Sequence, residues 1–540
     1  MTLISVTFVL FLGISLLVYY VLPADKRWIS LFAASLFFYL CSGWKHVVFV
    51  LSAAAAGYVC MRWIQKLYDE DAAASEAERQ EAAKPDDTKR TERKPEKKAG
   101  GHATDPAVRR KARRILTVGL AIVIAMLFVS KTDRLWLSAI RTITRGRITL
   151  YSLSALGISY YTFALAGYMA DVYWKKDRAE TGFCRLLLYL IYFPHITQGP
   201  IPRHGRLAPQ LFAGHAFDYE RLCFGLQRMV WGFFKKSVAA DRLALVTAAV
   251  FSSDTPYPGG ICLLAVLCSA FQLYFDFSGC MDIVIGVSEC FGITLDENFT
   301  RPFFAKSAAE FWRRWHITLG TWFKDYVYLP VSISRLTTEL SRRCKDRFGR
   351  KAARNVMTVV PLAVVWLLTG LWHGTGADYI LWGCYWGTII ICSTVFAKQI
   401  KDLDKKLSID PAGRGWQRWQ MVRTFLIFCG GRALTAPGSL RQSAGMMKRV
   451  FTAFGFSAFT DGTLQTLGLD FANFLVLLIA FIMIAAVDIL NERGVNIRCR
   501  IAALPLALRW FLYYLLIMSV IILGKYGAAY DSSAFIYAGF

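Results

Sequence analysis

The 540-residue chain has no CxxC pair among its thirteen cysteines, which are scattered and mostly lie inside apolar segments. Cysteines paired at short spacing are typical of zinc sites, and evenly spaced sets are typical of small disulfide-rich secreted domains. Scattered cysteines in apolar surroundings are typical of small buried thiols. The sequence therefore argues against a disulfide framework and against a metal site.

Charged residues are also scarce, at 19% of the chain against 55% hydrophobic residues. A soluble protein of this length usually divides into domains with polar surfaces and linkers. Here apolar runs recur along the whole chain, most clearly at residues 4–22, 47–61, 115–129, 474–487 and 511–523. Because a spanning helix needs about 20 mostly apolar residues, we predict an all-α, polytopic membrane protein with roughly eleven to thirteen membrane elements.

The first apolar run lacks two features of a secretory signal peptide. The preceding MTLIS carries no charge, and the run continues into VLPADKRW without a small-residue cleavage site. A signal peptide has a basic segment before its apolar core and a cleavage site after it. We expect this run to be a retained membrane helix.

Acidic residues are few beside basic ones, 38 against 63, which gives a formal net charge of +25. The basic residues gather in blocks that adjoin apolar runs, at residues 89–98, 108–114, 341–354 and 398–406. Nucleic-acid-binding proteins are basic too, but this placement is the one that the positive-inside rule predicts for cytoplasmic loops. We therefore expect no nucleic-acid partner, cytoplasmic basic loops, and an N-terminus outside.

Residues 69–107 contain almost no large apolar residue and many charges, so we predict a disordered cytoplasmic linker whose earlier half is at most transiently helical. No internal repeat is present. We expect five segments: peripheral transmembrane helices at 1–68, the linker at 69–107, a main body at 108–400, a polar loop at 401–420, and C-terminal transmembrane helices at 421–540.

One stretch of the main body, YFPHITQGPIPRHGRLAPQL at residues 192–211, is rich in proline and glycine and unlike a simple spanning helix. Such backbone survives at membrane depth only when it is buried in protein or lines a wet cavity. An interfacial loop is the other interpretation. We expect His195 and His204 to be loop residues or residues at the rim of a pocket.

A second stretch, FWRRWHITLGTWFKDYVYLP at residues 311–330, places two arginines, a histidine and a lysine among three tryptophans. Just before it, Ser307 and Glu310 match a capping box, which marks a helix N-terminus. We predict a helix that begins at about Ala308 and is closed with the help of Pro330.

A continuous helix would embed His316 in an aromatic surface made of two neighbouring stripes. One stripe is Trp312, His316, Leu319 and Phe323, and the other is Phe311, Trp315, Thr318 and Trp322. Arg313 and Arg314 would point elsewhere, toward lipid headgroups or a cytoplasmic mouth.

His373 follows a nearly uninterrupted apolar run within residues 359–387 and is flanked by Gly370, Gly374 and Gly376. Those glycines permit close backbone approach or a break in the helix. An ionisable residue in such a place is costly and is a functional candidate, although a single membrane histidine is more often a hydrogen-bonded structural residue.

Two carboxylates, Asp276 and Asp282, lie in LYFDFSGCMDIVIG, which is otherwise suited to a membrane span. Each costs about 2.5–3.5 kcal/mol on insertion scales, so partners are expected. Arg301 is one possible partner.

Taken together, these stretches resemble the membrane-bound O-acyltransferase superfamily, and within it the bacterial type that carries out alginate O-acetylation or teichoic-acid D-alanylation. The resemblance covers residues 1–64 and most of 155–400, and EFWRRWH followed by LWHG is its most specific pairing. The matching stretches are YFPHITQGPIPRH, QLYFDFSGCMDIVIG, FGITLDENFTRPFFAKSAAEFWRRWHITLGTWFKDYVYLP and LTGLWHGTGADYILWG.

The resemblance implies a ring of helices around a central tunnel, with His316 and His373 as the two histidines of the family. It implies an acyl thioester donor on the cytosolic side, acetyl-CoA or an acyl carrier protein, with no bound cofactor and no metal. The acceptor would be a polysaccharide or an extracytoplasmic acyltransferase- or esterase-like partner. Expected substrate or tunnel residues are Asp276, Trp312, Arg313, Trp315 and Trp372.

Acyl transfer to a hydroxyl needs a base for the alcohol proton, and a positioned base contributes roughly 10²–10⁴-fold. A low-dielectric site keeps histidine in its neutral, proton-accepting form. We expect His373 to be the base and His316 to orient the acceptor or polarise the acyl carbonyl. Arg313 or Arg314 could contact donor phosphates, because arginine suits bidentate phosphate contacts.

Three alternatives stay open at this stage. D-alanyl transfer from a carrier protein to teichoic acid uses the same machinery. A secondary transporter would also have broken helices and intramembrane Asp and His, but usually carries an inverted repeat. A structural scaffold for an export complex would leave both histidines dispensable.

Overall fold

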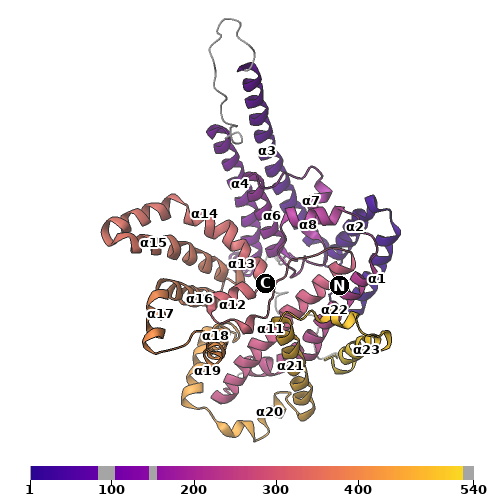
Figure 1. Ribbon diagram of the computed structural model, residues 1–540, viewed down its shortest axis with the longest axis vertical. Coiled ribbons are helices and arrows are strands. Elements are labelled where there is room, and N and C mark those ends of the chain that lie inside the picture. The colour runs from indigo at the N-terminus through magenta and orange to yellow at the C-terminus, as the bar shows by residue number, and fades with distance from the viewer. Residues whose placement is uncertain (1, 83–103, 145–154, 254, 527–540) are drawn as a thin grey trace. The chain divides into compact units, whose positions relative to one another are not determined.

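The computed structural model describes residues 2–82, 104–144, 155–253 and 255–526. In these residues regular structure is helical (Figure 1), apart from one isolated antiparallel bridge between Phe299 and Trp315. The prediction of an all-α protein is confirmed.

Six of the described helices are long and apolar enough to cross a membrane, or seven if two helices bent by 66° count as one span. The six are α3 (Trp44–Ala82), α4 (Pro106–Lys131), α11 (Gly259–Cys290), α15 (Arg335–His373), α21 (Phe471–Glu492) and α23 (Leu506–Leu523), and the bent pair is α16 (Ala377–Val395) with α17 (Ala397–Lys406). The chain is thus a multi-pass membrane protein, as predicted. The count of roughly eleven to thirteen membrane elements stays a prediction.

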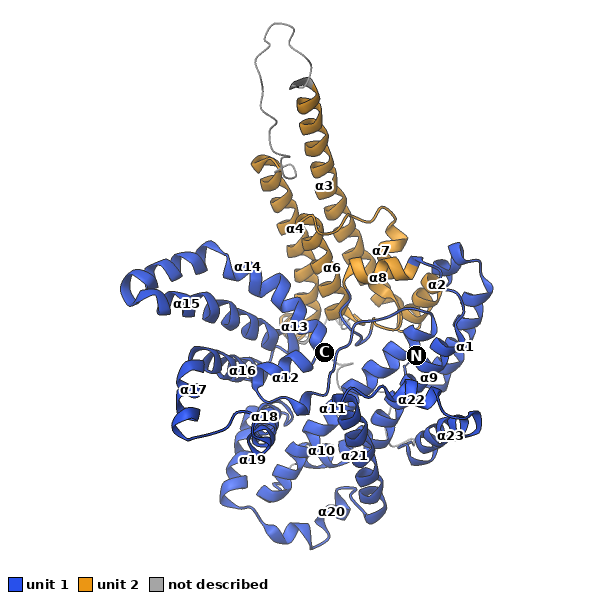
Figure 2. Ribbon diagram, in the orientation of Figure 1, with its two compact units in different colours: residues 1–30, 197–202, 212–540 blue, residues 31–196, 203–211 orange. Residues whose placement is uncertain are grey.

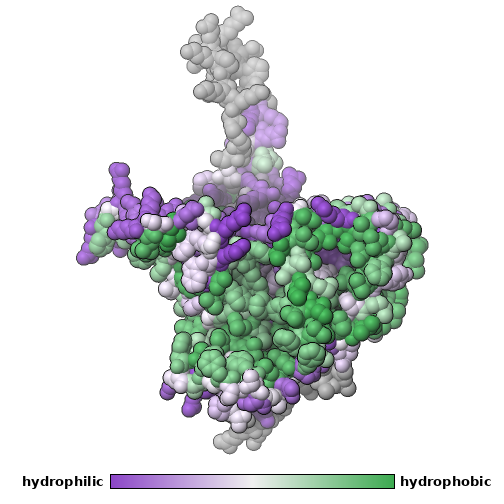
Figure 3. Space-filling view, turned by 60° about the horizontal axis from the view of Figure 1, so that its bottom comes forward, coloured by the Kyte–Doolittle hydropathy of each residue, from purple (hydrophilic) through white to green (hydrophobic). Residues whose placement is uncertain are grey.

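The surface has the character that a bilayer requires. On the face shown in Figure 3, hydrophobic residues cover a broad area and hydrophilic residues gather along its margins. Large apolar side chains of the candidate spans are exposed, including Ile482 of α21 at 60% and Ile522 of α23 at 68%. Apolar patches of this kind are unfavourable in water and are the expected lipid-facing surface of membrane helices.

The chain divides into two compact units (Figure 2), unit 1 with residues 1–30, 197–202 and 212–540, and unit 2 with residues 31–196 and 203–211. The five-segment division that composition suggested stays a prediction.

Unit 2 is built on α3, α4 and α6, which pack on one another at small residues. A Cβ added at Gly57 of α3 would lie 2.5 Å from a methyl carbon of Leu165 on α6, and one at Gly119 of α4 would lie 2.7 Å from the Cys60 sulfur on α3. Small residues let membrane helices approach closely. The other helices of unit 2 are most of α2 (Arg27–Leu40), α5 (Asp133–Ile143), α6 (Ile158–Tyr173), α7 (Phe183–Ile191) and most of α8 (His204–Phe212).

The predicted linker begins later than composition suggested. α3 continues through residues 69–82, because DEDAAASEAERQEA is dominated by alanine and glutamate, two strong helix formers. The disorder predicted for residues 69–82 is therefore wrong. Residues 83–103 lie outside the described residues.

In unit 1, α9 and α11 cross with their backbones almost in contact. Gly225 and Gly232 of α9 face Gly286 and Gly279 of α11, and a Cβ added at Gly232 would lie 2.5 Å from the Gly279 carbonyl oxygen. Side chains larger than hydrogen cannot fit there, so the glycines set the approach. The further helices of unit 1 are α1 (Val6–Val21), α9 (Tyr219–Phe233), α10 (Asp241–Phe251), α12 (Ala308–Arg314), α13 (Ile317–Phe323), α14 (Leu329–Ser332), α18 (Arg414–Thr435), α19 (Leu440–Thr452), α20 (Thr463–Thr466) and α22 (Ile497–Ala502).

Candidate active site

The capping box before the first candidate histidine is present as predicted. The Ser307 hydroxyl accepts a hydrogen bond from the Glu310 backbone N–H at 3.2 Å, and the Glu310 carboxylate accepts one from the Lys306 backbone N–H at 2.9 Å. α12 begins at Ala308, so both ends of this reciprocal cap hold its first turn.

The helix then ends earlier than predicted. α12 stops at Arg314, Trp315 is extended, and His316 has a φ of 46°, in the left-handed region. The two predicted aromatic stripes are therefore wrong, because no single helix runs through His316. The break is held by a short antiparallel contact in which Thr300 N–H donates to the Arg314 carbonyl at 2.9 Å and Ile317 N–H donates to the Asn298 carbonyl at 3.1 Å.

A left-handed conformation at a non-glycine residue costs of order 1–3 kcal/mol, and such residues cluster at functional sites. Here it turns the His316 ring away from the helix surface and into the protein, where the residue is only 2% exposed. Phe277 of α11 and Trp372 of α15 meet this ring edge-on, at 4.9 and 5.8 Å between ring centres. His316 lies outside the candidate spans, and its burial lowers its pKa to about 3. The imidazole is thus neutral at physiological pH.

Asn298, which the sequence did not single out, fixes the orientation of this imidazole. Its side-chain oxygen accepts hydrogen bonds from the Thr318 backbone N–H at 3.0 Å and the Thr318 hydroxyl at 2.8 Å, and lies 3.4 Å from His316 Nδ1. A backbone N–H only donates, so the atom facing it is the amide oxygen. That oxygen in turn only accepts, which favours a proton on His316 Nδ1 and a lone pair on Nε2.

The second candidate histidine, His373, ends α15 in an aromatic setting and is 6% exposed. Its ring centre lies 4.7 Å from Trp372 and 4.9 Å from Trp382 of α16. The prediction of close backbone approach is confirmed, since a Cβ added at Gly370 would lie 3.3 Å from the Cα of Gly383 on α16.

Trp372 contacts both histidines. Its indole lies 5.8 Å from the ring of His316 and 4.7 Å from the ring of His373, the next residue in the chain. Residues 57 positions apart in the chain therefore occupy one locality in unit 1. The central tunnel itself stays a prediction.

The predicted tryptophans of α12 and its C-terminal end belong to one aromatic network, because the ring of Phe311 contacts both Trp312 and Trp315. Trp312 packs edge-on against Trp382, which also contacts His373, and the Trp312 indole nitrogen is buried without an acceptor among the described residues. Trp315 is 2% exposed and stacks on Phe311, so it lies in packed core. Arg313 is exposed.

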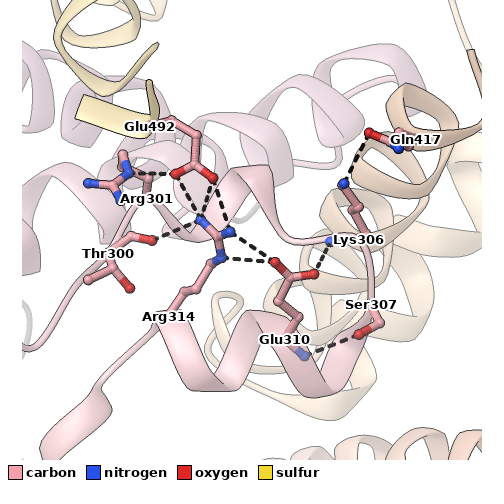
Figure 4. Close-up of polar contacts among 8 residues, drawn as sticks. All are labelled: Thr300, Arg301, Lys306, Ser307, Glu310, Arg314, Gln417 and Glu492. Atoms are coloured by element: carbon pink, nitrogen blue, oxygen red, sulfur yellow. Dashed lines mark hydrogen bonds and ion pairs between the residues drawn. The ribbon is translucent and has the colours of Figure 1, made fainter. Parts of the chain in front are cut away.

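Figure 4 shows a network of ion pairs that corrects two expectations. Arg314 does not point to headgroups or phosphates, because its guanidinium pairs with Glu310 at 2.9 Å and with Glu492 of α21 at 3.0 Å. Arg301 also pairs with Glu492, at 2.6 Å, and is not the partner of the membrane carboxylates. These pairs tie α12 to α21.

Asp276 and Asp282 do have cationic partners, as predicted from their cost. The ammonium of Lys236, in the π-helical segment Phe234–Ala240, lies 2.7 Å from Asp276 and 2.8 Å from Asp241. Asp282 pairs with Arg228 of α9 at 3.0 Å and with Lys235.

The other two histidines considered lie in unit 2. His195 is 1% exposed, its Nε2 lies 3.2 Å from the Tyr189 carbonyl, and burial lowers its pKa to about 4. His204 begins α8, contacts Asp177 at 2.8 Å and stacks on Tyr168.

The chain is similar to known proteins over most of its length. The family model described as "MBOAT, membrane-bound O-acyltransferase family" matches residues 154–342. The probable alginate O-acetylase of Azotobacter vinelandii is 30% identical over 383 residues, which are 70% of each chain. The peptidoglycan O-acetyltransferase of Helicobacter pylori is 29% identical over 53% of this chain and 56% of its own.

The teichoic acid D-alanyltransferase of Bacillus subtilis is 30% identical over 285 residues, which are 52% of this chain and 68% of its own. The similarity thus extends to both kinds of relative that the sequence motifs had indicated. The similarity to the alginate O-acetylase, at 30% identity over 70% of that protein, covers many more residues than the family model, which matches only residues 154–342. The chain belongs to the membrane-bound O-acyltransferase family.

Proposed function

We propose that this protein transfers a small acyl group from a cytosolic thioester to a hydroxyl of a cell-surface or secreted polysaccharide, with acetyl as the first candidate for that group. The observation that carries the proposal is that the rings of His316 and His373 both contact Trp372. Similarity to an alginate O-acetylase over 70% of the chain supports acetyl as the group transferred.

In the proposed reaction His373 takes the proton of the acceptor hydroxyl as its oxygen attacks the thioester carbonyl. The tetrahedral oxyanion then collapses, the C–S bond breaks, and the proton passes to the departing thiolate. A thioester is already activated, so the step requires no metal. The buried Trp312 indole N–H is suited to donate to the carbonyl oxygen, where the negative charge develops.

The geometry around His316 favours one of the two roles expected for it. With the proton on Nδ1 facing Asn298, Nε2 accepts hydrogen bonds and cannot donate one to an acyl carbonyl. A pKa of about 3 also makes this imidazole a weak base. We assign it to orienting the acceptor, because Nε2 accepts a hydrogen bond from a neighbouring hydroxyl of the same sugar, and we leave the proton of the reacting hydroxyl to His373.

The test uses purified full-length protein in detergent with labelled acetyl-CoA, with an acetylated carrier protein, or with a D-alanylated carrier protein. His373→Gln should lower the rate of transfer by about 10²–10⁴-fold, the contribution of a positioned base, and His316→Gln should reduce transfer with a larger effect on the KM for the acceptor. His46→Gln, the same change at a histidine of unit 2, is the matched control and should leave transfer unchanged. Normal transfer by His373→Gln together with loss in His316→Gln would reverse the roles.

D-alanyl transfer is the second candidate, favoured by the 30% identity to the teichoic acid D-alanyltransferase of Bacillus subtilis. Transfer from the D-alanylated carrier alone would select it.

Family membership removes the basis for the transporter and scaffold alternatives, which rested on isolated intramembrane polar residues. An extracytoplasmic acyltransferase- or esterase-like partner is the alternative immediate acceptor, and a transfer product on that partner would reveal it.

A further inference from the structure

A cleft of about 870 Å³ lies in unit 1 between the middle of α15 and the bend that joins α16 to α17. Five of its ten lining residues are basic and none is acidic. The basic residues are Arg350, Lys351 and Arg354 of α15 and Lys398 and Lys401 of α17. Asparagine and threonine side chains among the rest add hydrogen-bonding groups, so the cleft has the chemistry of an anion site.

The five basic residues of the cleft form a cluster of positive charge. Among the described residues, no carboxylate forms an ion pair with any of the five cleft cations. Before the non-helical Gly349 of α15 the situation differs, because Arg342 and Arg343 both pair with Glu339 at 2.9 Å. The positive charge of the cleft is therefore suited to binding an anionic ligand.

The cleft lies where the helices change from polar to apolar. α15 is charged up to Arg354 and then apolar from Val356 to Trp372, and α16 is apolar as far as the cleft. α17 bends away by 66° and exposes Ile400 and Leu403 beside its lysines. A short helix with apolar and basic faces next to a span is typical of the membrane interface, at the level of lipid headgroups.

We propose that this cleft binds the phosphate headgroup of an anionic phospholipid. Basic pockets between membrane helices at the cytoplasmic surface are suited to such headgroups, and the positive-inside rule places this end of the helices there. Exposed apolar side chains lie further along the same helix, where Leu367 and Leu368 of α15 are 46% and 40% exposed. The acyl chains of a bound lipid would lie along that surface.

The cleft is distant from the candidate active site. His373 is nineteen positions after Arg354 on α15, which is about 28 Å at ~1.5 Å per helical residue. That length is close to the ~30 Å hydrocarbon thickness of a bilayer. A donor held in the cleft by its phosphates would have to reach across that span to the candidate active site.

The test compares two double variants of the full-length protein, each lacking two positive charges. Arg354→Gln with Lys398→Gln alters the cleft, and Arg342→Gln with Arg343→Gln is the control on paired arginines of the same helix. Native mass spectrometry in detergent measures binding of phosphatidylglycerol, phosphatidylcholine, inorganic phosphate and coenzyme A. The altered side chains are exposed, so a single peak in size exclusion should confirm folding of both variants.

We expect the unaltered protein to prefer phosphatidylglycerol over phosphatidylcholine and the cleft variant to lose about 30-fold in affinity, since each basic side chain near an anionic lipid contributes about fivefold. The control variant should bind as before, and Arg354→Lys with Lys398→Arg should restore binding. Equal affinities for the two lipids, or equal losses in both double variants, would overturn the proposal. So would displacement of lipid by millimolar inorganic phosphate, or loss of coenzyme A binding in the cleft variant, because either assigns the cleft to a soluble ligand.

Discussion

Asn298→Asp should give the enzyme a new acid limb in its pH–rate profile. The substitution keeps an oxygen that accepts from Thr318 N–H and from the Thr318 hydroxyl, so the local fold is retained. What changes is charge, because a carboxylate then lies about 3.4 Å from His316 Nδ1 in a fully buried setting. A neighbouring negative charge favours the imidazolium and raises its pKa.

The size of the shift follows from the separation. At 3.4 Å and an effective dielectric constant of about 20, two unit charges attract by about 5 kcal/mol. Since about 1.4 kcal/mol corresponds to one pKa unit, the pKa of His316 should rise by about 3 to 4 units. Its starting value is about 3, so the variant should titrate near pH 6 to 7.

The assay is kcat/KM for acyl transfer between pH 5 and 8. Below its new pKa the His316 Nε2 carries a proton and no longer accepts a hydrogen bond from the acceptor, so the rate of Asn298→Asp should fall by up to about tenfold per pH unit, toward the rate of His316→Gln. The unaltered enzyme should show no limb from His316 in this window. Asn496→Asp, on the exposed N-cap of α22, is the matched control and should keep the original profile.

Superimposable profiles for Asn298→Asp and the unaltered enzyme would refute this reasoning. They would mean that Asn298 does not set the protonation of His316, or that the protonation of His316 is irrelevant to transfer. A uniform loss of rate at every pH would instead indicate a purely structural role for Asn298 and would also contradict the assignment.

Two further predictions concern the scaffold, both read from thermal unfolding in detergent. Lys236→Met removes an ammonium that lies 2.7 and 2.8 Å from two buried carboxylates, so the free energy of unfolding should fall by about 3–5 kcal/mol; an unchanged melting temperature would contradict the pairing. Gly232→Ala should lower the melting temperature strongly because its Cβ would meet the Gly279 carbonyl, whereas Gly415→Ala, with nothing within 4 Å, should not; equal melting temperatures would refute the close crossing of α9 and α11.

Features that depend on neighbouring residues could be predicted from the sequence. The long apolar runs, the Ser307–Glu310 cap and the need of Asp276 for a cationic partner each follow from local transfer or hydrogen-bonding energies. The helix at residues 69–82 could also have been predicted, from the high helix propensity of its alanine and glutamate residues. The prediction of disorder rested only on its many charges and its lack of large apolar residues.

Features that depend on distant residues could not be predicted. The helix break at His316 is held by backbone hydrogen bonds to the segment around Asn298. Arg314 forms an ion pair with Glu492, which is 178 positions away. Asn298 itself gave no signal, because a neutral amide carries little of the burial cost that drew attention to the histidines and aspartates. Lys236 reaches Asp276 only because two glycine pairs let α9 approach α11.

The central claim is that His316 and His373 serve one chemical event. A double-mutant cycle on acyl transfer measures this directly, with His316→Gln, His373→Gln and the combined variant assayed in the same preparation. Residues that act as a unit are strongly non-additive, so the combined variant should be no slower than the slower single variant. Losses that multiply would show that the two imidazoles act independently, and would contradict a shared site.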